Sequence, residues 1–248
     1  MKKRIIGLLS TIILLSALLL AGCGSKKDTL IVGTEAGFAP YEYMKGNDVV
    51  GIDMDIAQAI ADHLGKELEI KNMEFEGALI AVQNGTVDFV AAGVSVDEDR
   101  LEKMDFSIDY VNSTEVVVVN KEDPRVESID DLDNKIIGVQ QGNIADFWVE
   151  DNISAKEIKR YSKFGQAAED LKNGKIDCVV MDQFPAEDMV ATNSELVILD
   201  GVLFEDKYAI AVKKGNKDLL EDINTVIEQL KADGKIEEFT ANHTKKQD

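Results

Sequence analysis

The sequence predicts an α/β fold of two lobes, each a mostly parallel sheet flanked by helices, joined by two hinge crossings. Apolar runs alternate with amphipathic stretches along most of the chain, a pattern typical of strands and helices that build parallel sheets. The pattern Asn-Gly-x-(Val/Ile)-Asp-x-Val occurs at 84–90 and again at 173–179, which indicates two similar halves. No Gly-, Ser- or Pro-rich linker separates these halves, so short strand-like segments must cross between them.

The first half of the chain contains the elements of one predicted lobe. Residues 29–34 form an apolar run that favours a strand. Ile56, Ile60 and Leu64 share one helical face within 53–64, and Gly65 follows as a stop signal. Further stretches predict, in order, a strand at 68–73, a helix at 77–84 and a strand at 87–92.

The second half repeats this order. The apolar runs at 136–140, 158–161 and 176–181 favour strands, and the stretches 145–150 and 166–173 between them favour helices. A strong helix follows at 218–232, with these apolar side chains on one face: Leu219, Ile223, Val226, Ile227 and Leu230. In each copy of the repeated pattern a glycine can end a helix and a buried strand follows, so the two copies predict two facing half-sites.

The lobe boundaries follow from where polar residues interrupt the apolar pattern. We expect lobe 1 to contain 29–112 and, after a return crossing, 207–248, with lobe 2 at 113–206. The crossings are predicted at 111–114 and at 204–208. Two crossings of this kind make a hinged pair of lobes with a ligand cleft between them.

The N-terminus has the pattern of a targeting segment. Three basic residues precede an almost wholly apolar run that ends at Gly22-Cys23. This resembles a bacterial lipoprotein signal peptide, residues 1–22, with cleavage before Cys23, a lipid on the Cys23 thiol and a tether at 23–28. The protein is then expected outside the cytoplasm, lipid-anchored to the bacterial cell membrane. A transmembrane anchor is the alternative, although the run is short for a span.

Composition excludes several classes of function. The chain has 27 Lys and Arg against 47 Asp and Glu, a net charge of −20. Loss of the three basic residues of the signal peptide would lower this charge to −23, a field that repels nucleic acid. Besides Cys23 the chain has only Cys178, in an apolar run, which we interpret as a core residue. No zinc spacing, redox pair or other cofactor signal is present in the sequence.

Arg100 is the most informative candidate for a binding site. It follows a buried-looking strand that ends in small residues and a polar turn, at 88–100. Such a turn leaves backbone N–H groups and a hydroxyl free, and a guanidinium beside it can take a carboxylate in two parallel hydrogen bonds. A surface arginine among acids is the alternative. Asp182 ends the second repeated strand, where a turn or helix cap before Pro185 is the alternative.

Four segments together carry a resemblance to a known family. They are 33–41, 51–56, 75–88 and 93–107, the last including Arg100 and Asp105-Phe106-Ser107. In order and spacing they resemble the amino-acid-binding proteins of ABC importers, solute-binding protein family 3, with the type II periplasmic-binding-protein fold. The resemblance covers about 29–239. It implies a monomer without enzymatic activity that captures a free L-amino acid and delivers it to an ABC permease.

The resemblance also implies how the two poles of the amino acid are held. Arg100 would bind the α-carboxylate, helped by the hydroxyl and amide of Ser95. Backbone N–H groups at Asn143 and Ile144, where a helix starts, would add to this anion site. The α-ammonium would lie between the Gly93 carbonyl and the Asp182 carboxylate.

The ligand side chain would meet Phe38, Phe75 and Glu35. By the resemblance the two aromatic rings sandwich this side chain, and Glu35 faces its far end. A buried carboxylate without a partner is costly, so an unpaired Glu35 calls for a cation. We therefore expect a basic amino acid, arginine or lysine before histidine, and other polar amino acids next.

Several features depart from the family pattern. Relatives usually carry hydroxyls where this chain has Ala92, Asn143 and Ile144, and Trp148 could be core or line the rim of the site. Some relatives of the fold are dehydratases of cyclohexadienyl acids, so an enzyme is one alternative, and a ligand-sensing receptor domain is another. Against an enzyme, His63 and His243 are expected on the surface.

Overall fold

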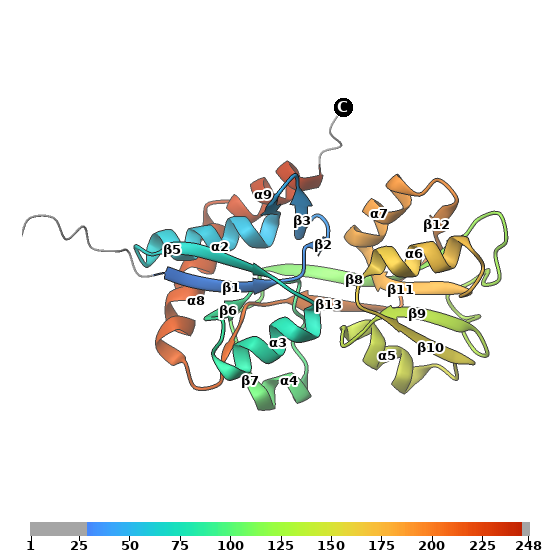
Figure 1. The fold of residues 1–248 in the computed structure, drawn as a ribbon, viewed down its shortest axis with the longest axis horizontal. Helices are drawn as coiled ribbons and strands as arrows, with labels where there is room; N and C mark the ends of the chain where they lie inside the picture. Colours follow the sequence, from blue (N-terminus) through green and yellow to red (C-terminus); the bar gives the residue numbers. More distant parts are fainter. Residues whose placement is uncertain (1–28, 245–248) are drawn as a thin grey trace, which may run out of the picture.

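Two sheet-containing lobes lie side by side along the long axis of the molecule, as Figure 1 shows for the computed structural model of the chain. The structure describes residues 29–244. The predicted α/β architecture of two lobes is confirmed, although the main sheet of each lobe is mixed rather than mostly parallel. The expected signal peptide at 1–22, the lipid-bearing Cys23 and the tether at 23–28 lie outside the described residues. Within 29–244 no helix is long and apolar enough to cross a membrane.

Lobe 1 is built on a five-stranded sheet. Its strands, in spatial order, are β5 (Glu67–Asn72), β1 (Thr29–Thr34), β6 (Phe89–Val90), β14 (Ala211–Lys213) and β7 (Met104–Phe106). The first three run parallel, and β14 is antiparallel to both its neighbours. The helices of this lobe are α2 (Ile52–His63), α3 (Phe75–Asn84), α4 (Glu98–Lys103), α8 (Lys217–Ala232) and α9 (Lys235–Thr244). A small sheet of β2 (Gly37–Phe38), β3 (Glu42–Lys45) and β4 (Asp48–Val50) projects from this lobe.

Lobe 2 is built on a six-stranded sheet. Its strands are β10 (Glu157–Tyr161), β9 (Ile136–Gln140), β11 (Cys178–Asp182), β8 (Val111–Asn120) and β12 (Leu196–Ile198), with β13 (Phe204–Tyr208) also on β8. β10, β9 and β11 run parallel, and β8 is antiparallel to each of its partners. The helices are α5 (Ile144–Asn152), α6 (Phe164–Lys172) and α7 (Gln183–Thr192).

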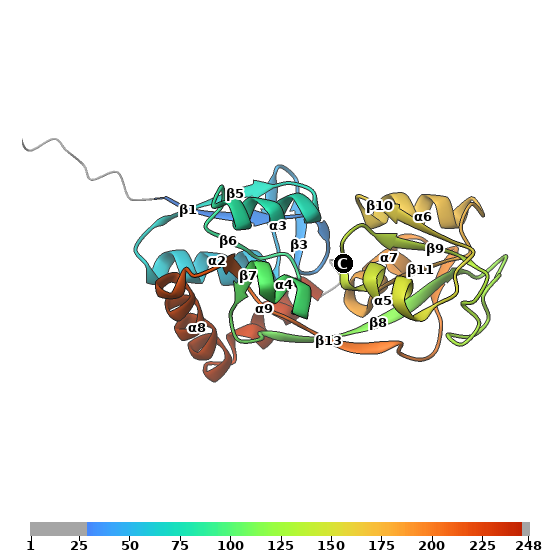
Figure 2. The ribbon, with the colours of Figure 1, turned by 90° about the horizontal axis from the view of Figure 1, so that it is seen from below.

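Two paired strands connect the lobes. β8 and β13 are antiparallel, with Val111 opposite Tyr208 and Glu115 opposite Phe204. Both strands run from one lobe into the other, which two perpendicular views show (Figures 1 and 2). The segments predicted as crossings, 111–114 and 204–208, fall in this pair.

The repeated sequence pattern makes the same local structure in both lobes. Each copy contains a left-handed glycine, Gly85 with φ 75° and Gly174 with φ 65°. In lobe 1 the backbone N–H of Ile31 donates to the Asp88 carboxylate at 2.7 Å. In lobe 2 the N–H of Ile136 donates to the carboxylate of Asp177, also at 2.7 Å. Each aspartate therefore fixes the register of the neighbouring parallel strand.

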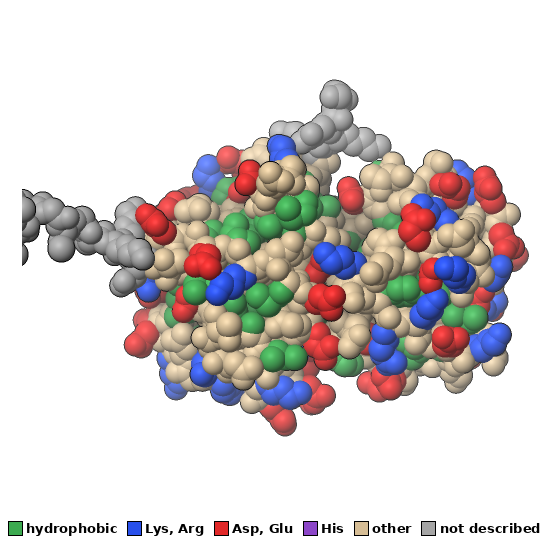
Figure 3. Space-filling view, in the orientation of Figure 1, with side chains coloured by type: hydrophobic (Ala, Val, Ile, Leu, Met, Phe, Trp, Pro, Cys, Tyr) green, Lys and Arg blue, Asp and Glu red, His purple; other side chains and the backbone are tan. Residues whose placement is uncertain are grey.

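One apolar cluster runs through both lobes, while two smaller clusters lie under α3 and α5. The large cluster includes Phe38 and Tyr41 of lobe 1 and Phe164 of lobe 2, so the facing surfaces of the lobes are in contact. Cys178 is fully buried, as predicted for a core residue, and burial raises the pKa of its thiol. On the face shown in Figure 3, acidic and basic side chains are interspersed over both lobes.

Candidate functional site

Arg100 is buried where lobe 1 meets lobe 2. Its backbone N–H donates to Asp97, the N-cap of α4, at 2.9 Å. Its guanidinium donates to the Ser95 carbonyl at 2.7 Å and to the Gly142 carbonyl at 2.8 Å, and its Nε lies 3.0 Å from the Asp97 carboxylate. Each terminal nitrogen thus uses one N–H in a hydrogen bond, while the Nε contact with Asp97 is an ion pair without hydrogen-bond geometry. Within the described residues, one donor on each terminal nitrogen therefore remains for an acceptor. Two such donors suit a carboxylate.

The surroundings of this guanidinium combine aromatic rings with acids. Its central carbon lies 5.6 Å from the centre of the Phe75 ring and 5.9 Å from that of Phe147. Burial lowers the pKa of Arg100, and nearby carboxylates oppose this effect. Because arginine keeps its proton even so, the site holds a fixed positive charge. The opposing carboxylates are Asp97, Asp206 and Asp182.

Asp182 lies in lobe 2 at the end of β11, fully buried. It occupies the N-cap position of α7 but makes no capping hydrogen bond. Its Oδ1 instead accepts hydrogen bonds from the hydroxyls of Tyr208 and Ser113, the latter at 3.4 Å. Its Oδ2 has no hydrogen-bond partner in the described part of the chain. Burial raises the pKa of Asp182 to about 6. A side chain that leaves its own helix end uncapped and points inward favours a site residue over a helix cap.

Gly93 is held in place by lobe 1. Its backbone N–H donates to the buried Asp53 carboxylate at 2.9 Å, and the Tyr110 hydroxyl donates to the same carboxylate at 2.8 Å. Its φ of 54° lies in the left-handed region. A Cβ at this position would lie 2.7 Å from the Phe38 ring. The close approach of the backbone to this ring therefore requires glycine.

The expectation of an unpaired Glu35 is wrong. Glu35 is buried, but Gln140 donates to its Oε2 at 3.2 Å and the Lys163 ammonium lies 3.3 Å from its Oε1. Both partners belong to lobe 2. Burial raises the pKa of Glu35, and Lys163 opposes this shift. The carboxylate is thus already matched by a cation of the protein itself, although the Oε1 contact lacks hydrogen-bond geometry.

The two predicted aromatic residues lie in different surroundings. Phe38 stacks on Tyr41, with ring centres 5.8 Å apart, and on Phe164 of lobe 2 at 6.0 Å. Phe75 is buried in the cluster under α3 and faces Arg100. The ring that faces Phe38 across the lobes is therefore Phe164.

The start of α5 differs from the expected anion site in one respect. The backbone N–H of Asn143 donates to the Gln140 carbonyl at 3.1 Å, so it is not free for a ligand. The Asn143 side chain caps its own helix by accepting from the Ala145 N–H at 3.3 Å. Ile144 is the first helical residue, and within 29–244 its N–H has no partner. Only the Ile144 amide can serve the predicted role.

The structure places Trp148, which the sequence left undecided, and His243, which was expected on the surface. Trp148 stacks on Phe204, with ring centres 5.1 Å apart, at the edge of the cluster under α5. The expectation that His243 lies on the surface is wrong. Its side chain is mostly buried against lobe 1, with Nε2 3.0 Å from the Asp55 carboxylate.

Glu115 and Asp206 join Asp182 in a cluster of carboxylates that we call the acid cluster. One oxygen from each of these three side chains lies within 4.8 Å of the other two. Glu115 is fully buried, and neither of its oxygens has a hydrogen-bond partner among the described residues. Asp206 accepts a hydrogen bond from the Ser95 hydroxyl at 2.5 Å. The acid cluster therefore links lobe 2 to the turn that holds Arg100.

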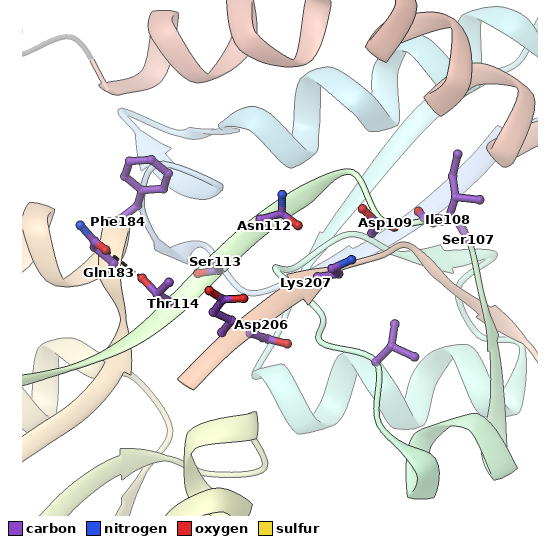
Figure 4. Close-up of a pocket in the computed structure, with 12 residues that line it drawn as sticks. Ser107, Ile108, Asp109, Asn112, Ser113, Thr114, Gln183, Phe184, Asp206 and Lys207 are labelled. Carbon is purple, nitrogen blue, oxygen red and sulfur yellow. Dashed lines mark hydrogen bonds between the residues drawn. The ribbon is translucent and has the colours of Figure 1, made fainter. Parts of the chain in front are cut away.

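A cavity of about 920 Å³ runs along the two crossing strands (Figure 4). Ser113 of β8 and Asp206 of β13 both line it. These two side chains also contact the predicted site residues Asp182 and Ser95. Space beside the hinge thus adjoins the acid cluster.

Comparison with known proteins identifies the family. Residues 30–246 match the bacterial extracellular solute-binding proteins, family 3. The chain belongs to this family. It is 29% identical over 216 residues to the L-cystine-binding protein TcyJ of Escherichia coli, covering 86% of this chain and 81% of that protein. It is 30% identical over 227 residues to the arginine-binding extracellular protein ArtP of Bacillus subtilis, covering 88% and 87%.

A solved structure agrees with these relatives. The substrate-binding protein AbpA from Streptococcus pneumoniae, an amino acid ABC transporter component bound to L-arginine, superposes on this family member with a TM-score of 0.83. The two are 34% identical, and the match covers 87% of this chain and 94% of AbpA. The relatives named here are binding proteins rather than enzymes.

Sequence reasoning missed most lobe 2 and hinge residues of the site in this solute-binding protein. Glu115 precedes four valines in a strand, and only a charge at the start of that apolar run signalled it. Lys163 stands directly before Phe164 at the start of α6 and gave no distinct signal. The missed residues are Ser113, Glu115, Gln140, Lys163, Phe164, Asp206 and Tyr208.

Proposed function

We propose that this solute-binding protein captures a free L-amino acid between its two lobes and delivers it to an ABC importer. The ligand proposed first is a basic amino acid, arginine or lysine before histidine, followed by other polar amino acids. The observation that carries the proposal is the pair Arg100 and Asp182, two buried groups of opposite charge from separate lobes. A zwitterion pairs its carboxylate with Arg100 and its ammonium with Asp182 at the same time, and so favours the closed form.

The proposed roles follow the contacts around each pole. Arg100 binds the α-carboxylate with its two remaining donors, together with the backbone amides of Ser95 and Ile144, because the Ser95 hydroxyl already donates to Asp206. The Gly93 carbonyl and Asp182 bind the α-ammonium. Phe38 and Phe75 contact the ligand side chain. The lobes divide at 112/113 and at 206/207, and β8 with β13 acts as the hinge.

Calorimetry with arginine, lysine, glutamine and cystine tests the two poles. For a micromolar ligand the binding free energy is about −8 kcal/mol. Removal of one partner from a desolvated charge pair costs roughly 2–5 kcal/mol. We expect Arg100→Ala and Asp182→Ala each to weaken binding at least tenfold while the fold persists. Arg125→Ala is the matched control, since Arg125 is exposed and pairs with Asp123 and Asp177. Unchanged affinity in both site variants would remove them from the site.

The nature of the ligand side chain depends on Glu35 and Lys163. A cationic side chain that reaches Glu35 must release Lys163, which is half-exposed on a flexible stem and can move into solvent. We expect Glu35→Gln to weaken binding of arginine several-fold more than binding of glutamine. Lys163→Gln should do the opposite and strengthen arginine binding selectively. Equal effects on both ligands in a thermal-shift and calorimetry series would argue against contact between Glu35 and the ligand side chain.

The setting of the protein is proposed from the N-terminal sequence and the family. We propose that the chain is cleaved before Cys23 and held at the outer face of the bacterial membrane by a lipid on that cysteine, as a monomer. Metabolic labelling with a radioactive fatty acid tests this, because Cys23→Ala should abolish labelling and release the protein.

We propose binding without chemistry. A thermal-shift panel of the twenty amino acids with ornithine, citrulline and cystine, run beside an assay for product formation from cyclohexadienyl acids, separates this from a dehydratase. Stabilisation by an amino acid without turnover is the expected result.

A further inference from the structure

Glu115 is the most unusual buried group near the proposed ligand. It lies on β8 directly opposite Asp182 of β11 in the antiparallel register. It is fully buried, and both of its oxygens lack hydrogen-bond partners within the described residues. A buried carboxyl in that state is costly unless it is neutral or meets a cation.

The groups around Glu115 come from two elements. β11 contributes Asp182, and β13 contributes Asp206 and Tyr208. The Tyr208 hydroxyl is directed to Asp182, and Asp206 takes the Ser95 hydroxyl. No Lys, Arg or His of the described chain forms an ion pair with Glu115. Three acids this close cannot all be ionised, and burial raises the pKa of Glu115 well above its usual range.

A second buried polar group without a partner lies nearby. The Tyr41 hydroxyl is fully buried and has no hydrogen-bond partner in the described part of the chain. Burial raises the pKa of the Tyr41 hydroxyl, and the charges of Asp182 and Asp206 raise it further. Tyr41 belongs to lobe 1, outside the acid cluster, and its ring centre lies 5.0 Å from that of Tyr208, whose hydroxyl donates to Asp182. Arg100 is the nearby cation: burial lowers its pKa, Asp206 and Asp182 oppose this effect, and it offers donors rather than acceptors.

We propose that Glu115 completes the ammonium pole of the site: without ligand it shares a proton with Asp182, and the arriving α-ammonium displaces that proton to solvent. This rests on the proposed function. The exchange is balanced, because the Glu115 carboxylic acid becomes a carboxylate paired with the ammonium and its proton passes to water or buffer. Glu115 is thus a specificity residue that selects a charged ammonium, since a neutral group cannot replace the lost proton.

Linkage fixes the direction of the pH effect. Binding that releases a proton becomes tighter as pH rises, as long as the ligand-free protein carries the proton and the complex does not. The Kd for arginine should therefore fall by up to tenfold per pH unit over that range.

Calorimetry of arginine binding at pH 7 in phosphate and in Tris tests the exchange. These buffers differ in ionisation enthalpy, so a released proton makes the observed enthalpy depend on the buffer. We expect release of about one proton for the native protein and close to none for Glu115→Gln. Glu42→Gln is the matched control. Glu42 is also a fully buried acid whose pKa burial raises, but the carboxylate that raises it most is Asp53 rather than Asp182. This variant should release the same proton as the native protein.

The outcomes are separable. Arginine binding with the same enthalpy in both buffers overturns the proton exchange and leaves the proposed function intact. Failure of every amino acid to bind overturns the proposed function itself. A thermal shift with Na⁺ or Ca²⁺ alone that Glu115→Gln abolishes would make the acid cluster a metal site, and this also overturns the exchange. If Glu115→Gln does not fold, the buffer dependence of the binding enthalpy of the native protein still decides whether a proton is released.

Discussion

At the scale of single residues, the proposed site depends on positions where the backbone conformation and the neighbouring atoms allow only one type of residue. Gly93 shows this most clearly. Its N–H is bound to Asp53, its φ is left-handed, and the Phe38 ring occupies the space of a side chain. A residue with a Cβ must therefore move either the turn or the ring, and both belong to the proposed site.

We expect Gly93→Ala to destabilise the protein by about 2 kcal/mol or more and to weaken ligand binding. The left-handed conformation alone costs alanine about 1 kcal/mol, and the contact with Phe38 adds to this. Gly77→Ala is the control, because Gly77 lies in α3 with open space around it. There alanine should stabilise by roughly 0.5–1 kcal/mol. Urea unfolding measures both, and equal signs would contradict this account.

The residue scale also marks where sequence reasoning ends. Arg100 and Asp182 could be selected as candidates because the apolar pattern shows where the strand before Arg100 ends and that Asp182 ends the other strand. Glu35 was correctly expected to be buried, but its partners Gln140 and Lys163 lie over a hundred residues away in sequence. No local pattern reports such pairing, since it depends on how two lobes meet.

At the scale of elements, the long amphipathic helices and apolar strands were predictable, while short or polar elements were not. The predicted strand at 87–92 contains only Phe89–Val90 in regular pairing, because the Asp88 carboxylate takes the neighbouring Ile31 N–H. α7 and α9 were missed, since their apolar faces are weak and α7 begins Gln183-Phe184-Pro185. Tertiary contacts rather than intrinsic periodicity hold them.

α9 is one such element, and His243 joins it to lobe 1. The His243 Nδ1 lies 3.1 Å from the Tyr43 hydroxyl and its Nε2 lies 3.0 Å from the Asp55 carboxylate. We expect His243→Ala to destabilise the protein by about 1–2 kcal/mol, the worth of two partly buried hydrogen bonds. Hydrogen exchange should speed up selectively in α9.

His63 provides the matched control for this change. Its side chain is 39% exposed, and its ion pair with Asp222 spans 3.8 Å. His63→Ala should therefore change stability by less than about 0.5 kcal/mol. If both substitutions have the same effect, the contacts of His243 do not hold α9.

At the scale of the whole molecule, the distribution of buried acids sets how stability depends on pH. Burial raises the pKa of Asp53 to about 6 and that of Glu42 well above its usual range. Burial also raises the pKa of Asp182 to about 6 and that of Glu115 well above its usual range. The folded protein therefore holds more protons than the unfolded chain between about pH 4 and at least pH 6. Its net charge of −20 adds to the cost of ionising these groups.

We expect the ligand-free protein to be more stable at pH 5 than at pH 8. An acid whose folded pKa is raised contributes stability that is complete below its unfolded pKa and is lost as pH rises through the folded value. For Asp53 this loss, from 3.8 to about 6, amounts to roughly 3 kcal/mol. Calorimetric scans should give a Tm at least about 5 °C higher at pH 5.

Two further observations set the low-pH limit of this stability trend and identify the carboxyl groups that cause it. Lysine contacts lower the pKa of Asp105 and Asp170, so their stabilisation is lost only below about pH 4 and should produce a maximum near pH 4–5. Glu42→Gln should flatten the decline between pH 5 and pH 8, because an amide carries no proton to lose. Glu42→Gln should leave proton release on arginine binding unchanged. The variant therefore distinguishes the protons that affect folding stability from the proton released when the ligand binds. A Tm that rises from pH 5 to pH 8 would mean that these carboxyls are ionised in the folded protein and have partners other than those described.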